Sequence, residues 1–154
     1  MTFLRSLFHN IGVVLVGLVV AYVGTRLDSI LGVPNFRSLG GTIAGSLLVA
    51  AGFLLRMWAT YIFYEHRMKV ISLSPQAVLV TSGPYRFSRN PLYLGGNVFV
   101  FFGAGCLLGS PSALVLTVLH LPLVDLFIRR EETQLEARFG DQWLRYKQHV
   151  RRWM

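Results

Sequence analysis

The stretch Ser82-Gly83-Pro84-Tyr85-Arg86-Phe87-Ser88-Arg89-Asn90-Pro91-Leu92-Tyr93-Leu94-Gly95-Gly96 is the densest run of turn formers, arginines and tyrosines in the chain. Its two prolines, Pro84 and Pro91, interrupt any continuous helix, because proline lacks the N–H group that a helix interior needs. Asn90 followed by Pro91 is typical of a helix start, with asparagine in the cap position and proline in the first turn. We therefore expect a turn that leads into a helix, with Arg89 beside its positively polarised end, where a carboxylate or phosphate could bind.

The composition around this stretch is that of a membrane protein. The chain has 154 residues, of which 53% are hydrophobic and 14% charged, with a net charge of +8. A soluble domain of this size cannot hide so much apolar surface, because small domains bury a smaller share of their area. The basic residues mostly flank apolar runs, which favours a membrane over a nucleic-acid partner. The single cysteine, Cys106, and the scattered histidines indicate no disulfide framework and no metal site.

Four apolar runs predict an all-α integral membrane fold with about four transmembrane helices in a single domain, residues 1–154. The expected spans are residues 8–25, 39–64, 92–108 and 112–129, close to the length of about 20 residues that crosses a bilayer. The second span opens with Gly41 and Gly45, in the spacing that permits close contact between helices. Only residues 109–111 separate the third and fourth spans, which predicts a tight antiparallel hairpin near the C-terminal end of the chain.

Residues 130–154 form a charged, amphipathic tail. Gly140 predicts the end of one helix and Asp141 the N-cap of another. In the second helix, one face contains Trp143, Tyr146, Lys147 and Val150 and can lie on the bilayer or on the site. The connection from Glu65 to Pro91 and the tail contain most of the basic residues. Four spans place both on the same side of the membrane together with Arg5. The positive-inside rule then predicts that the N- and C-termini are cytoplasmic.

A helical hairpin also brings together polar residues that are distant in the sequence. Arg89 and Asn90, before the third span, reach the same depth as Glu131 and Glu132, after the fourth. Such a pair of basic and acidic groups predicts a pocket for a zwitterion, with its carboxylate against Arg89 and its ammonium group or a ribose diol against a glutamate. The alternative is that the two glutamates only neutralise neighbouring arginines at the lipid surface.

Ionisable groups inside the expected spans are costly in lipid and are therefore functional candidates. Arg56 lies about two turns before the end of the second span, where it could snorkel to the surface or meet an anionic group of a substrate. Asp125 has Arg129 four residues later, a favourable helical pair that favours a structural role. His120 lies on the same helical stripe as Phe127 and Glu131, which faces the expected pocket, but we expect His120 to be a neutral histidine bonded to a neighbouring helix.

Ordered motifs give the chain a resemblance to a known family. The segment Leu79-Val80-Thr81-Ser82-Gly83-Pro84-Tyr85-Arg86 is followed by Arg89-Asn90-Pro91-Leu92-Tyr93-Leu94-Gly95, and then by Glu131-Glu132-Thr133-Gln134-Leu135 and Phe139-Gly140-Asp141-Gln142-Trp143. In this order the motifs resemble the isoprenylcysteine carboxyl methyltransferases and the related phospholipid N-methyltransferases. Arg56-Met57-Trp58-Ala59 is similar to the family's earlier span, whereas the first span carries no recognisable signature.

The resemblance implies an integral membrane methyltransferase that uses S-adenosylmethionine and is built on a helical hairpin. The lack of a GxGxxG strand–helix unit agrees with this. The implied cofactor-binding residues are Ala77, Val78, Leu79, Val80, Tyr85, Arg89, Asn90, Pro91, Leu92, Tyr93, Gly95, Glu131 and Glu132. Asn90 departs from the histidine of the methyl-esterifying enzymes. Because asparagine cannot become cationic, we expect no proton transfer there and a substrate other than isoprenylcysteine itself.

The function expected from this resemblance is methyl transfer to a lipophilic or membrane-associated small acceptor at the cytoplasmic membrane face. The acceptor group is a carboxylate, an amine or a thiol. An anionic acceptor needs a cation to orient it, and Arg56 and Arg129 are the candidate catalytic residues. The expected partners are the lipid bilayer and the acceptor, without nucleic acid or metal, and the sequence does not indicate an oligomeric state.

Two alternative functions stay open. The first is an NAD(P)H-dependent membrane reductase of the sterol-reductase type, whose terminal part has a similar Arg-x-Pro-x-Tyr-x-Gly motif. The second is a non-catalytic four-helix membrane subunit that has kept the fold. The Glu131-Glu132 pair and the Phe-Gly-x-x-Trp motif that follows it favour the methyltransferase. Tyr85 and Tyr93 also have a second interpretation, as aromatic residues of the membrane interface.

Overall fold

The computed structural model describes residues 2–68 and 78–154. In these residues the chain forms helices and no strand. The helices long and apolar enough to cross a membrane are α1 (Thr2–Leu31), α2 (Leu39–Glu65), the continuous run Pro91–Leu108 and α5 (Pro111–Phe139). The predicted all-α fold with four spans is therefore confirmed for the described part of the chain, which is a multi-pass membrane protein.

The helices are longer than the hydrophobic runs that predicted them. α1 extends past residues 8–25 at both ends, and α5 extends past residues 112–129 as far as Phe139. Hydropathy marks the part of a helix that suits lipid, whereas the hydrogen-bonded backbone continues until a breaker. For α5 that breaker is Gly140, whose φ of +49° lies in the left-handed region, as its predicted role at a helix end requires. The short helix α6 (Asp141–His149) has Gly140 rather than Asp141 in its cap position.

The third span begins where the prolines predicted. Asn90 occupies the cap position and Pro91 the first turn of α3 (Pro91–Tyr93), which runs into the π-helix η2 (Leu94–Val100) and then into α4 (Phe101–Leu108). The π-helical part lies against α2. The two helices approach so closely that a Cβ atom on Gly52 would lie 2.4 Å from the carbonyl oxygen of Gly95. Glycines therefore set the distance between the second and third spans.

The same close approach continues along α2 at the glycine pair that the sequence singled out. A Cβ atom on Gly45 would lie 2.5 Å from the backbone nitrogen of Leu107 and 2.6 Å from the carbonyl oxygen of Gly103. Gly41 makes a looser contact, 3.7 Å from the carbonyl oxygen of Cys106. The predicted close helix packing at this pair is confirmed, with Gly45 as its tight point.

The third span and α5 meet at a turn that α1 fixes in place. The hydroxyl of Ser110 accepts a hydrogen bond from the Ala113 N–H group at 3.1 Å and so caps α5. Asp28 of α1 in turn accepts bonds from the Ser110 hydroxyl, at 2.5 Å, and from the Ser112 N–H group, at 2.9 Å. The start of α5 is therefore attached to the first span as well as to the third.

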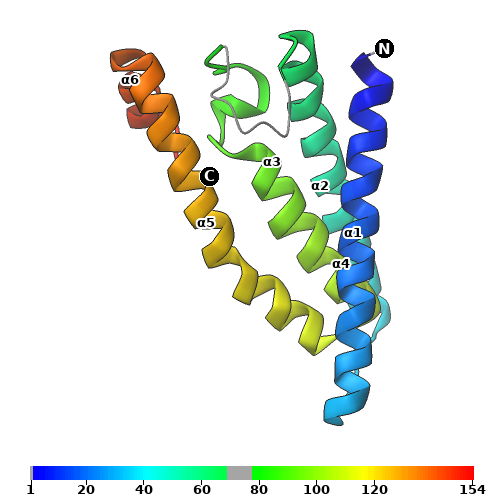
Figure 1. Cartoon of the computed structure of the whole chain (residues 1–154). Helices are drawn as coiled ribbons and strands as arrows, with labels where there is room; N and C mark the ends of the chain where they lie inside the picture. Colours follow the sequence, from blue (N-terminus) through cyan, green and yellow to red (C-terminus); the bar gives the residue numbers. More distant parts are fainter. Residues whose placement is uncertain (1, 69–77) are drawn as a thin grey trace.

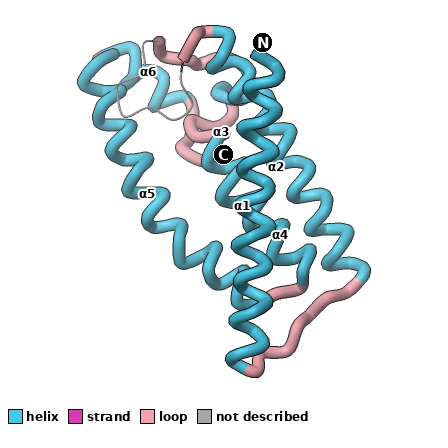
Figure 2. The backbone as a smooth tube through the Cα atoms, turned by 45° about the vertical axis from the view of Figure 1, so that its right-hand side comes forward, coloured by secondary structure: helices cyan, strands magenta, loops and turns pink. Residues whose placement is uncertain are grey.

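Beyond this turn α5 diverges from the third span, as Figures 1 and 2 show. The predicted hairpin is therefore tight at its turn, where α4 contacts α5, and its two helices separate farther along. α6, the N-terminus and the start of the third span all lie at the open end of the splayed pair (Figure 1). This arrangement places the polar motifs of the chain together at one end of the bundle.

We predict that Gly45→Ala lowers the free energy of unfolding by about 1–3 kcal/mol, because the new methyl group overlaps the backbone of α4. Gly40→Ala is the matched control, since no atom lies within 4 Å of the corresponding Cβ position. It should be neutral or slightly stabilising, because alanine favours helix over glycine. Denaturant titration of both variants in detergent micelles measures this, and equal effects would contradict the proposed tight contact.

Candidate functional site

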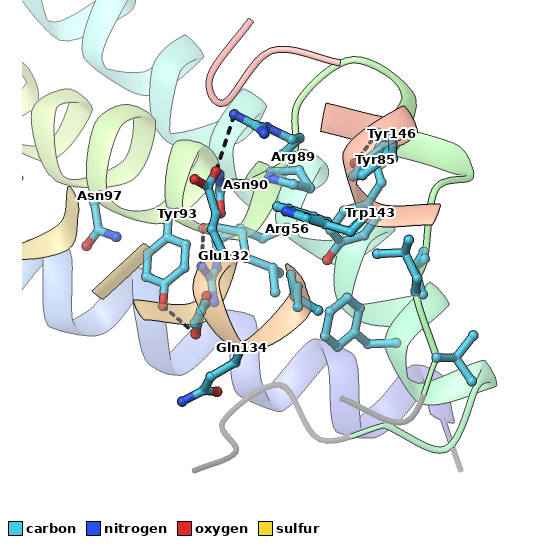
Figure 3. Close-up of a pocket in the computed structure, with 18 of the residues that line it drawn as sticks. Arg56, Tyr85, Arg89, Asn90, Tyr93, Asn97, Glu132, Gln134, Trp143 and Tyr146 are labelled. Atoms are coloured by element: carbon cyan, nitrogen blue, oxygen red, sulfur yellow. Dashed lines mark hydrogen bonds and ion pairs between the residues drawn. The ribbon is translucent and has the colours of Figure 1, made fainter. Parts of the chain in front are cut away.

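A cavity of about 310 Å³ lies at the open end of the bundle. It is lined by side chains from α1, α2, the segment before the short 3-10 helix η1 (Gly83–Arg86), the start of the third span, α5 and α6. Figure 3 shows the labelled side chains gathered around this space. The volume is at the lower end of the range of about 300–1,000 Å³ that is common for small-molecule sites.

Most of the residues that the resemblance singled out line this cavity. They are Val78, Leu79, Val80, Tyr85, Arg89, Asn90, Pro91, Leu92, Tyr93, Glu131 and Glu132, together with Arg56. Ala77 lies outside the described residues. Gly95 and Arg129 are described but do not line the cavity.

Glu132 is the centre of a buried cluster of charges. A terminal nitrogen of Arg89 lies 3.3 Å from its Oε1 atom, and the two side chains are only 8% and 9% exposed. Arg152 donates to both carboxylate oxygens of Glu132, at 3.1 and 2.7 Å, and also to Asp125 at 3.1 Å. The hydrogen bond with Glu132 raises the pKa of Arg152 above its ordinary value. Glu132 therefore does more than neutralise surface arginines: it joins the segment before the third span, α5 and the C-terminal segment.

Backbone carbonyls of the C-terminal segment complete this attachment. The N–H group of Arg89 donates to the carbonyl oxygen of Arg151 at 3.0 Å. The Arg152 carbonyl oxygen accepts bonds from the Ser88 hydroxyl, at 3.1 Å, and from the Asn90 side-chain amide, at 3.2 Å. Asn90 makes no side-chain cap to the helix that it precedes. The amide at this position thus holds the C-terminal segment, a task that needs no proton transfer.

Glu131 has different surroundings from Glu132, although the two are neighbours in sequence. Its carboxylate accepts a hydrogen bond from the Tyr93 hydroxyl at 2.9 Å, and Figure 3 draws this bond at the edge of the cavity. The structure gives Glu131 no arginine partner, in contrast to the two arginines on Glu132. Glu131 therefore provides negative charge that a cationic group in the cavity can use.

Several polar atoms of cavity residues are buried without a hydrogen-bond partner in residues 2–68 and 78–154. They are the Tyr85 hydroxyl, the Nε and one terminal nitrogen of Arg89, and the Nε1 of Trp143. Burial raises the pKa of Tyr85 well above its ordinary value, so that its hydroxyl stays protonated and can donate. Buried polar groups in folded proteins are nearly always paired. These donors are therefore suited to the acceptor atoms of a bound ligand.

α6 closes one side of the cavity with its apolar face. Trp143 is 2% exposed and Tyr146 is 9% exposed. The Tyr146 hydroxyl donates to the Tyr85 carbonyl oxygen at 2.7 Å, and the Arg89 guanidinium lies over the Trp143 ring, 5.6 Å from its centroid. The sequence predicted that this face of α6 lies either on the bilayer or on the site. In the structure it contacts the site.

Arg56 does not snorkel to the surface but points into the bundle, where it is 7% exposed. Its Nε donates to Asn10 at 2.9 Å, one terminal nitrogen donates to the Leu92 carbonyl oxygen, and the other lies 3.2 Å from the Nε2 of His9. The glycines of the third span provide the space. A Cβ atom on Gly95 would lie 2.8 Å from the Arg56 Cγ atom, so Gly95 shapes the site without lining it.

Two predicted residues of α5 lie away from the cavity. The Arg129 side chain is 62% exposed and pairs with Asp125 at 2.6 Å, as the helical spacing predicted. It is therefore not placed to orient a bound acceptor. His120 does not line the cavity and makes no hydrogen bond through its buried Nδ1, although its ring stacks on Phe101. Arg129 was a candidate because an anionic acceptor needs a cation, and His120 because of its helical stripe. The divergence of α5 from the third span was not part of either expectation.

Several residues that line the cavity were not among the site residues predicted from the sequence. They are His9, Val13, Phe63, Asn97, Gln134, Leu135, Trp143 and Tyr146. His9 and Asn10 are polar residues in an otherwise apolar first span, and this was the signal that could have identified them. The sequence predicted that Trp143 and Tyr146 share one helical face, but it did not decide whether that face contacts the membrane or the site.

Comparison with known proteins gives a consistent result. The family model described as phospholipid methyltransferase matches residues 41–142. A protein of Haemophilus influenzae described as an uncharacterized protein is 46% identical over 48 residues, which are 30% of this chain and 76% of that relative. No solved structure shows a significant match to the chain. The matched range includes Arg56 and Glu132, whereas His9 and Arg152 lie outside it.

We predict that Glu132→Gln lowers the free energy of unfolding by about 3 kcal/mol, because it leaves the buried Arg89 side chain without its counter-ion, whereas Arg152 keeps Asp125. Glu136→Gln is the matched control on the same helix, since Glu136 pairs with Lys147 at 3.4 Å on the surface. Exposed pairs contribute at most about 1 kcal/mol. Unfolding titrations in the same detergent compare the two, and a loss for Glu132→Gln as small as that for the control would contradict the structural role of the cluster.

Proposed function

This chain belongs to the phospholipid methyltransferase family, and we propose that it is an S-adenosylmethionine-dependent methyltransferase. The acceptor is a lipophilic or membrane-associated small molecule with a carboxylate, amine or thiol group. The observation that carries the proposal is the set of buried, unpartnered donors on Tyr85, Arg89 and Trp143 in one cavity with Glu131. The family match supports methyl transfer as the class of reaction, and the cavity offers a place where that reaction can occur.

The polar groups of the cavity complement those of the cofactor. S-adenosylmethionine carries hydrogen-bond acceptors on its carboxylate and adenine, which suit the free N–H groups of Arg89 and Trp143. It also carries an ammonium group and a ribose diol, which suit the carboxylate of Glu131. Phe63 and Tyr85 form a stacked pair with ring centroids 5.4 Å apart, and such a surface suits a planar ring. These features support the fit of the cofactor to the residues present.

The chemistry asks the protein mainly for alignment and for exclusion of water. When bound, S-adenosylmethionine supplies a methyl group on a positively charged sulfur. Well-oriented reactants gain roughly 7–11 kcal/mol over free ones, so rigid positioning by the Glu132 cluster serves the reaction directly. Trp143 and Tyr146 shield the cavity from water, which protects an activated methyl group. Arg56 is the cavity cation that could orient an anionic acceptor.

We place the reaction at the cytoplasmic membrane face. The N-terminus, α6 and the start of the third span lie at one end of the bundle (Figure 1). Arg5 and the basic residues after α5 lie in the segments at that end, and positive charge concentrates on the cytoplasmic side of membrane proteins. A cofactor from the cytosol and an acceptor from the bilayer can meet there.

The proposal predicts binding of S-adenosylhomocysteine, the demethylated form of the cofactor, to the purified protein in detergent. Isothermal titration calorimetry measures this, with NADPH as the parallel ligand. Heat of binding from S-adenosylhomocysteine and none from NADPH is the expected result. If S-adenosylhomocysteine does not bind, the proposal is contradicted, and binding of NADPH instead would favour the membrane reductase.

A second prediction concerns the unpartnered hydroxyl of Tyr85. Tyr85→Phe should weaken S-adenosylhomocysteine binding about tenfold, the effect of losing one good hydrogen bond to the ligand. The variant should not lose stability, because the hydroxyl has no hydrogen-bond partner among the described residues. Tyr22→Phe, at an exposed position of α1, is the matched control for affinity and stability. Unchanged affinity together with lower stability would show that the hydroxyl serves the fold rather than the ligand.

A further inference from the structure

Arg56 is a buried cation without a counter-ion. The chain contains 7 aspartate and glutamate residues, and all of them lie in the described part of the chain. None of the ion pairs there involves Arg56. Its three partners, Asn10, Leu92 and His9, are neutral acceptors. An uncompensated buried charge is costly, and an anionic ligand in the cavity would relieve that cost.

The contact with His9 fixes the protonation of that histidine. A guanidinium group has no acceptor atom, so the Nε2 atom of His9 accepts the bond and carries no proton. The ring is then neutral, and its Nδ1 atom carries the remaining N–H group. While it holds Arg56, His9 can therefore donate to a ligand but cannot take a proton through Nε2. Both His9 and Arg56 line the cavity.

Asn10 orients the guanidinium through a buried network between the first two spans. Its side-chain oxygen accepts from Arg56, and its amide donates to the Thr60 hydroxyl at 2.8 Å and to the Ser6 carbonyl oxygen at 2.8 Å. Ser6, Asn10 and Thr60 are all fully buried. Since the amide nitrogen is bound to acceptors, the oxygen is held toward Arg56. The arginine is thus a rigid donor rather than a flexible one.

Other residues of the cavity lining have the opposite electrostatic character. Arg89 already faces Glu132, which is shared with Arg152, and among the described residues Glu131 has the Tyr93 hydroxyl as its partner. An anion gains little net electrostatic attraction from Arg89, because the charge of Arg89 is already compensated. The cavity lining therefore contains an unpaired positive charge, on Arg56 of α2, and an unpaired negative charge, on Glu131 of α5.

We propose that Arg56, His9 and Asn10 form a subsite for an anionic oxygen group, a carboxylate or a phosphate, built by the first two spans. The subsite adds detail to the proposed function and rests on it. That function names the two ligands that can supply such an anionic group, the cofactor and the lipophilic acceptor. Arg56 and the Nδ1–H group of His9 contact the anion, and Asn10 is a positioning residue. Because the family match begins at residue 41, His9 and Asn10 are contributions of this chain beyond the matched range.

The decisive variant is Asn10→Asp, which keeps an acceptor beside the Arg56 Nε atom and adds the missing counter-ion. Binding of dodecanoate, dodecyl phosphate and dodecyltrimethylammonium is measured by equilibrium dialysis in a non-ionic detergent, and S-adenosylhomocysteine binding by calorimetry. Arg56→Gln removes the charge and serves as the second variant. Thr117→Val is the matched control, because Thr117 is buried in α5 and bonded only to its own helix, at the Ala113 carbonyl oxygen.

The subsite predicts that Asn10→Asp and Arg56→Gln weaken binding of an anion about tenfold or more, with dodecyltrimethylammonium binding and the control unchanged. A loss confined to dodecanoate or dodecyl phosphate assigns the anion to the acceptor, and a loss confined to S-adenosylhomocysteine assigns it to the cofactor. Unchanged binding of dodecanoate, dodecyl phosphate and S-adenosylhomocysteine alike in Asn10→Asp, or an equal loss for the cationic amphiphile, would overturn the subsite. If the wild-type protein binds dodecanoate but not S-adenosylhomocysteine, the subsite stands and the proposed function fails.

Discussion

The buried carboxylate of Glu132 is the interaction on which the site depends. It lies between Arg89 and Arg152 and so joins three segments that are far apart in the sequence. The end of the bundle that holds this carboxylate is the one where α5 has diverged from the third span (Figure 1), and the Glu132 ion pairs connect the two there. A buried ion pair is stabilising only when its members are well satisfied. Here the carboxylate has both oxygens occupied, and the arginine nitrogens that remain free are those beside the cavity.

The membrane imposes a second constraint, which explains where the polar residues lie. Polar groups within a span are tolerated when they face the protein interior and find partners there. Ser6, Asn10 and Thr60 satisfy one another between α1 and α2, and Arg56 completes the network. Gly95 and Gly96 leave the room that this arginine occupies. The first span is therefore part of the polar interior rather than only a membrane anchor, and the cavity lining contains charges of both signs.

Much of this arrangement could be predicted from local sequence features. Apolar runs predicted the helices, Asn90-Pro91 predicted the start of the third span, and the short turn after Leu108 brought Arg89 to the level of Glu132. The remainder depends on contacts that no local pattern encodes. The bonds from Ser110 and Ser112 to Asp28 attach the start of α5 to the first span, and its divergence leaves Arg129 and His120 outside the cavity. The direction of Arg56 likewise depends on Asn10, forty-six residues away in sequence.

The central claim is that the cavity beside Glu132 receives the cofactor, and hydrogen–deuterium exchange with and without S-adenosylhomocysteine tests it directly. Ligand binding slows the opening of the backbone that surrounds the bound molecule. The account predicts slower exchange in residues 78–93 and in α6, with no change at the opposite end of the bundle, in residues 109–113. Slower exchange confined to segments outside the cavity, or no change despite binding, would contradict the account.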